Sequence, residues 1–137
     1  MSVRVLVVDD SIYMRDIVCT RLEYFGCKIV AQASNGDHAV KLFKALRPDL
    51  VTLDVLMPAL NGIDALSAFR LMKSENHKAH IMVVSAVPFE HTRESFVKEG
   101  ALEYVLKPFT KFSFEPARRK LERIFPELAR FQSRLGA

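Results

Sequence analysis

The strongest constraint on the fold is an alternation of two hydrophobic periods along the chain. Short, nearly continuous apolar runs alternate with longer segments whose apolar residues recur every three or four positions. The first period is typical of strands covered on both faces, and the second is typical of amphipathic helices. Five strands are predicted, over residues 1–8, 28–33, 49–53, 80–84 and 101–106. Their alternation with helices predicts a parallel sheet with right-handed crossovers and helices on both faces.

Residues with known capping and turn preferences mark the helix boundaries. Ser11 is placed to cap a helix that ends before Gly26. The pair Asn35-Gly36 precedes a second helix, which ends at Arg47-Pro48. The pair Asn61-Gly62 precedes a third helix. A fourth helix separates the last two strands, and a fifth follows them.

The length and composition exclude several other classes of protein. A chain of 137 residues, of which 50% are hydrophobic and 26% charged, fits one globular domain with its own core. Its apolar runs are far shorter than the roughly 20 residues that span a bilayer, so we expect a cytoplasmic protein without membrane association. The two cysteines, Cys19 and Cys27, have no metal-ligand spacing around them and are too few for a disulfide scaffold.

Polar residues stand at the carboxyl ends of four predicted strands. Asp9 and Asp10 follow the first strand, and Asp54 follows the third. Ser85 follows the fourth strand, and Lys107 follows the fifth. In an open parallel sheet, ligands bind outside the carboxyl ends of the strands, where the strand order reverses. We therefore expect these five residues to form the functional site.

The residue types at these strand ends favour a magnesium and phosphate site. Three carboxylates at one sheet edge repel one another unless a cation neutralises them. Oxygen ligands with room for water suit Mg²⁺, and the lack of histidine or cysteine among these residues disfavours zinc. Lys107 would add a positive charge and Ser85 a hydroxyl donor, which suits a tetrahedral dianion such as phosphate. A carboxylate in this setting can attack phosphorus and form an acyl phosphate.

Four stretches of the chain together resemble the receiver domains of response regulators, the CheY-like superfamily. The matching stretches are Val-Leu-Val-Val-Asp-Asp-Ser (5–11), Asp-Leu-Val-Thr-Leu-Asp-Val-Leu-Met-Pro-Ala-Leu-Asn-Gly (49–62), Val-Val-Ser-Ala (83–86) and Gly-Ala-x-x-Tyr-Val-Leu-Lys-Pro-Phe (100–109). The resemblance covers about residues 3–125, and the order and spacing of the stretches are highly specific. It implies a flavodoxin-like, doubly wound α/β fold with a five-stranded parallel sheet and helices on both faces.

The resemblance also implies a role for each acidic residue. Asp54 would accept a phosphoryl group from a phosphohistidine on a sensor histidine kinase, in a reaction that requires Mg²⁺. Asp9, Asp10 and Asp54 would hold the Mg²⁺ ion. The backbone carbonyl of Leu56 would be a further metal ligand.

Three other residues would respond to the phosphoryl group in a protein of this family. Ser85 would shift toward the phosphoryl oxygens, Tyr104 would swing inward behind it, and Lys107 would pair with the phosphate. The Lys107-Pro108 peptide bond is expected to be cis. An output protein would then recognise the face formed by the fourth helix, the fifth strand and the last helix.

Two positions beside the site are apolar where many members of the family carry polar residues. These are Leu56, two residues after Asp54, and Val87, two residues after Ser85. Neither side chain can orient a water molecule for in-line attack on an acyl phosphate. We therefore expect slow autodephosphorylation.

The basic residues are concentrated after the last predicted strand. Residues 1–106 contain 12 Lys+Arg and 13 Asp+Glu, whereas residues 107–137 contain 8 and 3. We expect a receiver domain over residues 1–125 and a helical extension over residues 126–137. A lengthened loop over residues 110–115 is predicted to precede a helix that begins at Pro116, and Pro126 is predicted to kink or split that helix.

This basic, Phe-rich tail has three interpretations. It packs on its own sheet as an ordinary last helix, or it forms a phosphorylation-sensitive surface for a partner or a homodimer. Nucleic-acid binding has the least support, because no recognised DNA-binding motif accompanies the basic residues. Those residues are Arg118, Arg119, Lys120, Arg123, Arg130 and Arg134.

The sequence therefore predicts a signalling switch of a two-component phosphorelay, and not a metabolic enzyme. We expect a stand-alone receiver, a layout associated with chemotaxis. One alternative is a receiver domain cut from a larger regulator such as a chemotaxis methylesterase. The stretches Val51-Thr-Leu-Asp-Val and Asn61-Gly-Ile-Asp-Ala-Leu resemble the receiver domains of those enzymes. A second alternative is a Mg²⁺-dependent phosphohydrolase that uses the same carboxylates on a small substrate.

Overall fold

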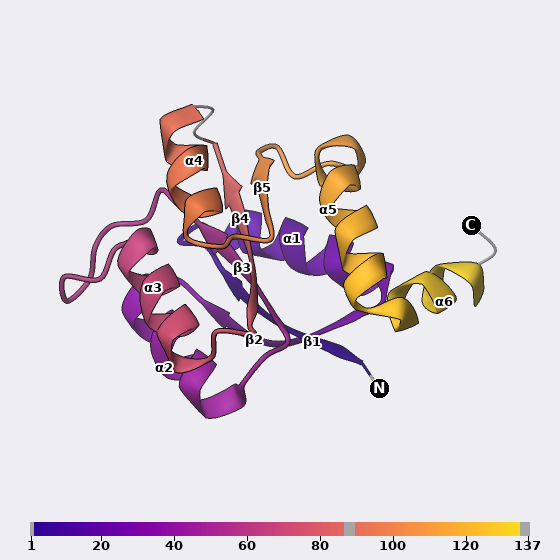
Figure 1. The fold of residues 1–137 in the computed structure, drawn as a ribbon, viewed down its shortest axis with the longest axis horizontal. Helices are drawn as coiled ribbons and strands as arrows, with labels where there is room; N and C mark the ends of the chain where they lie inside the picture. Colours follow the sequence, from indigo (N-terminus) through magenta and orange to yellow (C-terminus); the bar gives the residue numbers. More distant parts are fainter. Residues whose placement is uncertain (1, 87–89, 135–137) are drawn as a thin grey trace.

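The structure, a computed structural model, describes residues 2–86 and 90–134, and for residues 131–134 it describes the backbone alone. In this part of the chain, five strands alternate with helices, and two helices follow the last strand (Figure 1). The strands are β1 (Val3–Val8), β2 (Cys27–Ala33), β3 (Leu50–Asp54), β4 (His80–Ser85) and β5 (Glu103–Leu106). The helices are α1 (Ile12–Phe25), α2 (Gly36–Leu46), α3 (Ala65–Glu75), α4 (Glu90–Lys98), α5 (Lys111–Ile124) and α6 (Pro126–Arg134).

The five strands form one parallel sheet in the order β2-β1-β3-β4-β5. The predicted flavodoxin-like α/β fold is therefore confirmed. The chain moves outward from β1 in one direction through β2 and in the other through β3, β4 and β5. The strand order reverses beside β1, so the carboxyl ends of β1 and β3 border the crevice where this fold binds ligands.

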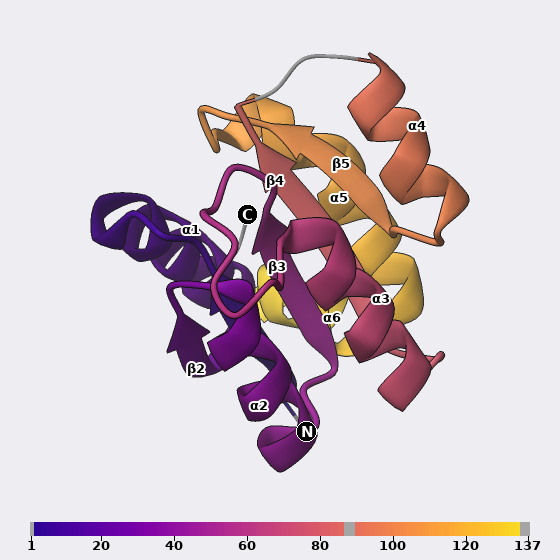
Figure 2. The same ribbon diagram turned by 90° about the vertical axis from the view of Figure 1, so that its left-hand side faces the viewer.

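Helices cover both faces of the sheet (Figure 2). The helices α1, α5 and α6 pack on one face, which receives Val5 and Val7 of β1. The helices α2, α3 and α4 pack on the other face, which receives Leu6 and Val8. Neighbouring β1 residues thus point to opposite faces and are buried on both, as the continuous apolar run predicts.

Capping residues begin and end the helices at most of the predicted positions. The Ser11 hydroxyl accepts a hydrogen bond from the Met14 N–H at 3.2 Å, and Gly26 ends α1 with a positive φ of 110°. The Asn35 side chain accepts the His38 N–H at 2.8 Å at the start of α2. These bonds satisfy backbone groups that a helix leaves unpaired at its ends.

The predicted start of the last helix is wrong, because α5 begins at Lys111 and not at Pro116. Thr110 and Ser113 form a capping box in which each side chain bonds the backbone N–H of the other. This reciprocal pair fixes the helix start five residues before the proline. Pro116 then lies within the helix, where it removes one backbone hydrogen bond.

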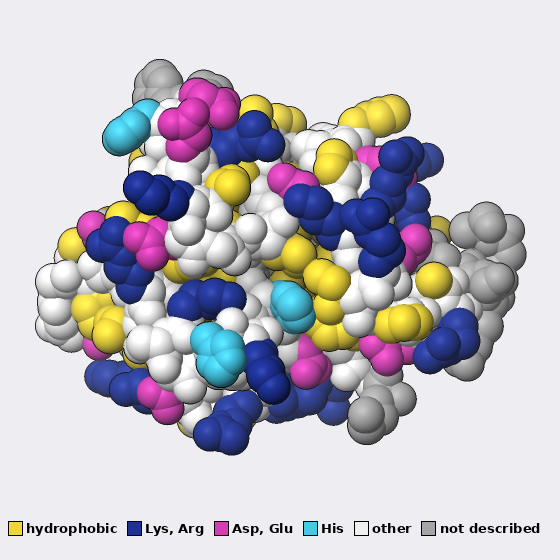
Figure 3. Space-filling model, in the orientation of Figure 1, with side chains coloured by type: hydrophobic (Ala, Val, Ile, Leu, Met, Phe, Trp, Pro, Cys, Tyr) yellow, Lys and Arg dark blue, Asp and Glu magenta, His cyan; other side chains and the backbone are white. Residues whose placement is uncertain are grey.

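The last helix is split at Pro126 as predicted, since α5 ends at Ile124 and α6 begins at Pro126. Leu128 of α6 is buried in the same apolar cluster as Leu22 of α1 and Leu121 of α5. Lys and Arg side chains gather on the outer surface of α5 (Figure 3). The tail thus contributes an apolar inner face to the core and a basic face to the surface. In the described residues, no helix is both long enough and apolar enough to cross a membrane.

Candidate functional site

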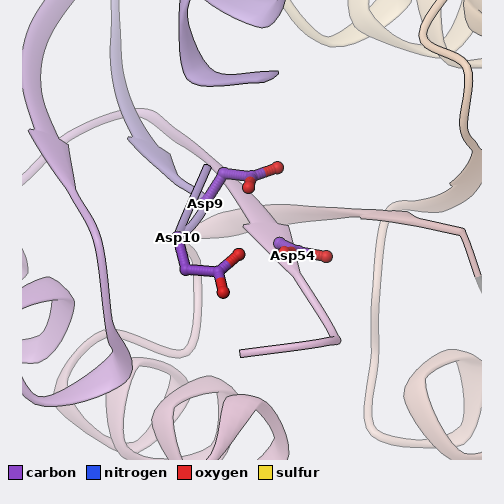
Figure 4. A group of neighbouring side chains, drawn as sticks. All are labelled: Asp9, Asp10 and Asp54. Atoms are coloured by element: carbon purple, nitrogen blue, oxygen red, sulfur yellow. The ribbon is translucent and has the colours of Figure 1, made fainter. Parts of the chain in front are cut away.

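Three carboxylates converge at the carboxyl ends of β1 and β3. Asp9 and Asp10 follow β1 directly, and Asp54 is the last residue of β3. One oxygen from each carboxylate lies within 4.8 Å of the others. Figure 4 shows the three side chains side by side at these strand ends. Asp9 and Asp54 are each 2% exposed, whereas Asp10 is exposed.

Lys107 is the positive partner of the buried carboxylates. It follows β5, and its Nζ lies 2.9 Å from Asp9 Oδ2 and 3.4 Å from Asp54 Oδ1. The predicted cis bond between Lys107 and Pro108 is present. The structure therefore brings together four of the residues predicted from the strand ends.

The other predicted residues lie around this group. Asp54 pairs with Val84 in the sheet, so Ser85, which is fully buried, lies one residue further along β4. Tyr104 is on the outer strand β5 and is buried with the core residues on the α2–α4 side. Leu56 donates its backbone N–H to Asp54 Oδ1 at 3.2 Å, while its side chain is 57% exposed. Val87 lies outside the described residues.

Local hydrogen bonds fix the loop between β1 and α1. The Ser11 N–H donates to Asp9 Oδ1 at 2.9 Å, which orients the carboxylate from within its own loop. Arg15 Nη1 donates to the backbone carbonyl of Asp9 at 2.7 Å. The hydrophobic pattern of the sequence does not predict a role for Arg15. Its place one helical turn after Ser11 is the signal that could have found it, since residues four apart share a helix face.

The electrostatics of the site favour a bound cation. Burial, followed by the charge of Asp9, raises the pKa of Asp54 to about 6. Burial would lower the pKa of Lys107, but the hydrogen bond with Asp9 and the charges of Asp54 and Asp9 outweigh it and raise that pKa. One lysine thus faces three carboxylates. Three carboxylate donors, one of them open to water, fit a hard divalent cation such as Mg²⁺, which keeps several waters when bound.

The raised pKa of Asp54 predicts a pH-dependent effect on stability. Because the folded-state pKa of about 6 lies above the ordinary 3.8, ionisation of Asp54 destabilises the folded protein. This cost is absent below about pH 4, grows as the pH rises through about 6, and is constant above that. In buffer without divalent cations, Asp54→Asn should therefore raise the free energy of unfolding near neutral pH by about 2 kcal/mol. Urea titrations across this range should show the gain disappear at acidic pH, and a variant no more stable than the parent at neutral pH would contradict the prediction.

Both cysteines lie away from the site in the packed core. Cys19 is in α1 and Cys27 is in β2, and both are buried. Burial raises the pKa of Cys19 to about 11 and that of Cys27 to about 12. Neither thiol is therefore ionised at neutral pH, and a thiolate nucleophile is excluded.

Comparison with known proteins agrees with this arrangement. Residues 5–115 match the family model of the response regulator receiver domain. The chain is 38% identical over 109 residues to the chemotaxis protein CheY of Thermotoga maritima, with 80% of this chain and 88% of that protein covered. It is 36% identical over 126 residues to a protein-glutamate methylesterase/protein-glutamine glutaminase of Geobacillus kaustophilus, covering 90% of this chain but 35% of that protein.

A solved structure shares the fold. The crystal structure of the CheX-CheY-BeF3-Mg complex from Borrelia burgdorferi superposes with a TM-score of 0.72 and 24% sequence identity. The match covers 89% of this chain and 88% of that one. The described part of the chain thus has the same fold as this solved structure.

Proposed function

The chain belongs to the response regulator receiver domain family, and we propose that it is a molecular switch that accepts a phosphoryl group on Asp54. The observation that carries this proposal is the position of the Asp54 carboxylate. It is buried at the end of β3, beside Asp9 and Asp10, and 3.4 Å from the Lys107 ammonium. Asp9 is equally buried, but it follows β1 and lies closer to the Lys107 ammonium, at 2.9 Å, whereas Asp54 is the last residue of β3, the middle strand of the sheet.

The site residues have distinct roles in phosphoryl transfer. An Asp54 oxygen attacks the phosphorus of a phosphohistidine, the P–O bond forms, and the P–N bond to the histidine breaks. Lys107 neutralises charge on the transferred group, and Ser85 offers a hydroxyl to one of its oxygens. Asp9, Asp10, Asp54 and the Leu56 carbonyl would hold Mg²⁺, which when bound neutralises the crowded negative charge.

The phosphoryl group would favour one of two arrangements of the Ser85 and Tyr104 region. Tyr104 is buried on β5, at the side of the sheet that α4 covers. The phosphoryl group accepts a hydrogen bond from Ser85 in only one of these arrangements, so the population shifts toward that arrangement. An output protein that binds the face of α4, β5 and α5 would bind this arrangement more tightly than the other. A homodimer through the same face is an alternative form of output.

The donor is a sensor histidine kinase, and chemotaxis is the pathway that the similarity to a CheY protein favours. The methylesterase relative supports the alternative that the chain is the receiver part of a larger regulator. In both cases one phosphoryl group is added to each chain, and small phosphomonoesters are not turned over. DNA binding by the tail has the weakest support, because Arg118 and Arg119 of α5 are already paired with Glu115 and Glu122.

A phosphorylation assay tests this function directly. Incubation with Mg²⁺ and acetyl phosphate, a small acyl phosphate donor, should add one phosphoryl group to the intact mass of the chain. Neutral hydroxylamine should remove it, because it cleaves acyl phosphates and leaves phosphoserine intact. A label that resists hydroxylamine would place the modification on a hydroxyl group and contradict the proposal.

Leu56→Asn should shorten the lifetime of the phosphorylated state severalfold. The Leu56 side chain is 57% exposed beside the acceptor, so a polar side chain there can hold a water molecule in line with the phosphorus. The decay of the labelled protein after removal of the donor measures this effect. Leu60→Asn, a similar change at an exposed position four residues later, is the matched control. Equal lifetimes in both variants and the parent would contradict the prediction. Val87→Glu, at the second apolar position, should also shorten the lifetime.

A further inference from the structure

A groove between α1 and α5 lies apart from the acidic site. It has a volume of about 750 Å³, and its lining comes from the last turns of α1 and the first turns of α5. Phe25 and Phe114 line its inner part, and their rings pack edge to face with centroids 5.6 Å apart. Both rings are buried, and both helices cover the same face of the sheet (Figure 1). The groove is therefore built on the packed core.

Two aromatic side chains at the groove are open to solvent. Tyr24 of α1 is 70% exposed, and Phe112 of α5 is 85% exposed. Neither is needed to complete the core beneath them, which Phe25 and Phe114 already fill. Exposed aromatic side chains beside a concave surface are typical of sites that bury a partner's apolar residues.

The charges at the groove leave two cations unmatched. Arg118 is paired with Glu115 and Glu122. In residues 2–86 and 90–134, by contrast, neither Arg21 nor Lys111 forms an ion pair. A carboxylate that enters the groove would supply the missing counter-charge to Arg21 or Lys111. The groove thus combines an apolar contact surface with unpaired positive charge, which is complementary to acidic groups.

We propose that this groove binds an acidic amphipathic helix of a partner protein. Aliphatic or aromatic residues of the helix would lie between Tyr24 and Phe112, and its carboxylates would face Arg21 and Lys111. A groove between two helices fits this mode of recognition, in which apolar anchors recur at helical spacing. The site is separate from the acidic cluster, so binding does not require phosphorylation of Asp54.

Two other occupants fit the groove less well. A second copy of the chain in a two-fold dimer would present the same patch, so it would bring two further unpaired cations, Arg21 and Lys111, to the interface. A nucleic acid strand would place phosphates near the Glu115 carboxylate, which lines the groove. Only two unpaired cations, Arg21 and Lys111, would be there to neutralise them. An acidic helix matches the apolar and the basic residues together.

A selection experiment with the full, unphosphorylated chain tests the proposal. A displayed library of random peptides is selected on the parent protein, with Phe112→Ser protein present in excess to remove peptides that bind elsewhere. The recovered peptides should be acidic and should carry apolar residues at helical spacing. Fluorescence anisotropy then gives the affinity of one labelled recovered peptide. Phe112→Ser and Lys111→Glu should each weaken its binding by at least about tenfold.

Matched variants on other surfaces separate a local effect from a general one. Leu71→Ser changes an exposed apolar residue of α3, and Lys78→Glu reverses an exposed charge. Both should change the affinity by less than about twofold. Recovery of basic peptides, or of none that depends on Phe112, would overturn the proposal. It would also be overturned if a labelled thymidine oligonucleotide bound more tightly than the peptide, or if sedimentation showed a dimer that Phe112→Ser abolished.

Discussion

Asp54→Asn should reduce phosphorylation by acetyl phosphate and Mg²⁺ to background. The substitution removes the nucleophilic oxygen while it keeps the size of a side chain that is 2% exposed, so the fold should persist. Asp9 and Asp10 remain, yet they follow β1 and do not end β3. Intact mass measured over time gives the extent of labelling. Among the predicted changes this effect is the largest, because it removes the bond-forming atom.

Asp16→Asn is the matched control for that experiment. Asp16 is an exposed aspartate of α1 and is not part of the acidic group, so the same change of charge and shape leaves that group complete. This variant should be labelled at the rate of the parent. Hydroxylamine-sensitive labelling that persists in Asp54→Asn would assign the acceptor to another carboxylate and contradict the account.

Asp10→Asn should weaken Mg²⁺ binding by at least about tenfold. Even groups that only orient a metal ligand typically cost 10- to 100-fold when they are removed, and a direct charged ligand should cost no less. Asp10 is exposed, so the fold loses little, and the remaining carboxylates still define the site. Amide NMR shifts of residues in the loop after β1 follow the Mg²⁺ titration. With excess chelator, phosphorylation of the parent should stop.

The Mg²⁺ affinity of Asp16→Asn should equal that of the parent, which makes it the control here as well. If Asp10→Asn binds Mg²⁺ as tightly as the parent, Asp10 is not a ligand. The ion would then bind through Asp9 and Asp54 alone, and the proposed metal site would need a different set of donors.

The sheet edge could be predicted because its residues follow a rule of topology. Asp9, Asp54 and Lys107 are separated along the chain, but each comes directly after a strand or ends one. Parallel strands bring such residues to one edge, whatever the lengths of the connecting helices. The polar residues at the strand ends therefore predicted this group. The ion pairs of Lys107 with Asp9 and Asp54 confirm that the residues lie together.

Other features depend on contacts that hydrophobic periodicity does not report. The start of α5 is set by the reciprocal bonds of Thr110 and Ser113, and Pro116 gave a misleading signal for it. Arg15 reaches the Asp9 carbonyl through the fold of the loop after β1. The groove brings Tyr24 and Phe112 together from two distant helices. In each case the signal lies in the geometry of side chains, which a one-dimensional pattern does not contain.

Titration with beryllofluoride and Mg²⁺ decides whether Asp54 is the acceptor, because this mimic places a phosphoryl-like group on an aspartate without a kinase. Amide NMR spectra of the parent should show saturable, Mg²⁺-dependent shifts at Ser85, Tyr104 and Lys107, and Asp54→Asn should show none of them. Sedimentation of the same samples reports whether the activated form dimerises. If the parent binds no beryllofluoride, or if Asp54→Asn binds it equally well, Asp54 is not the acceptor and the switch is not built around it.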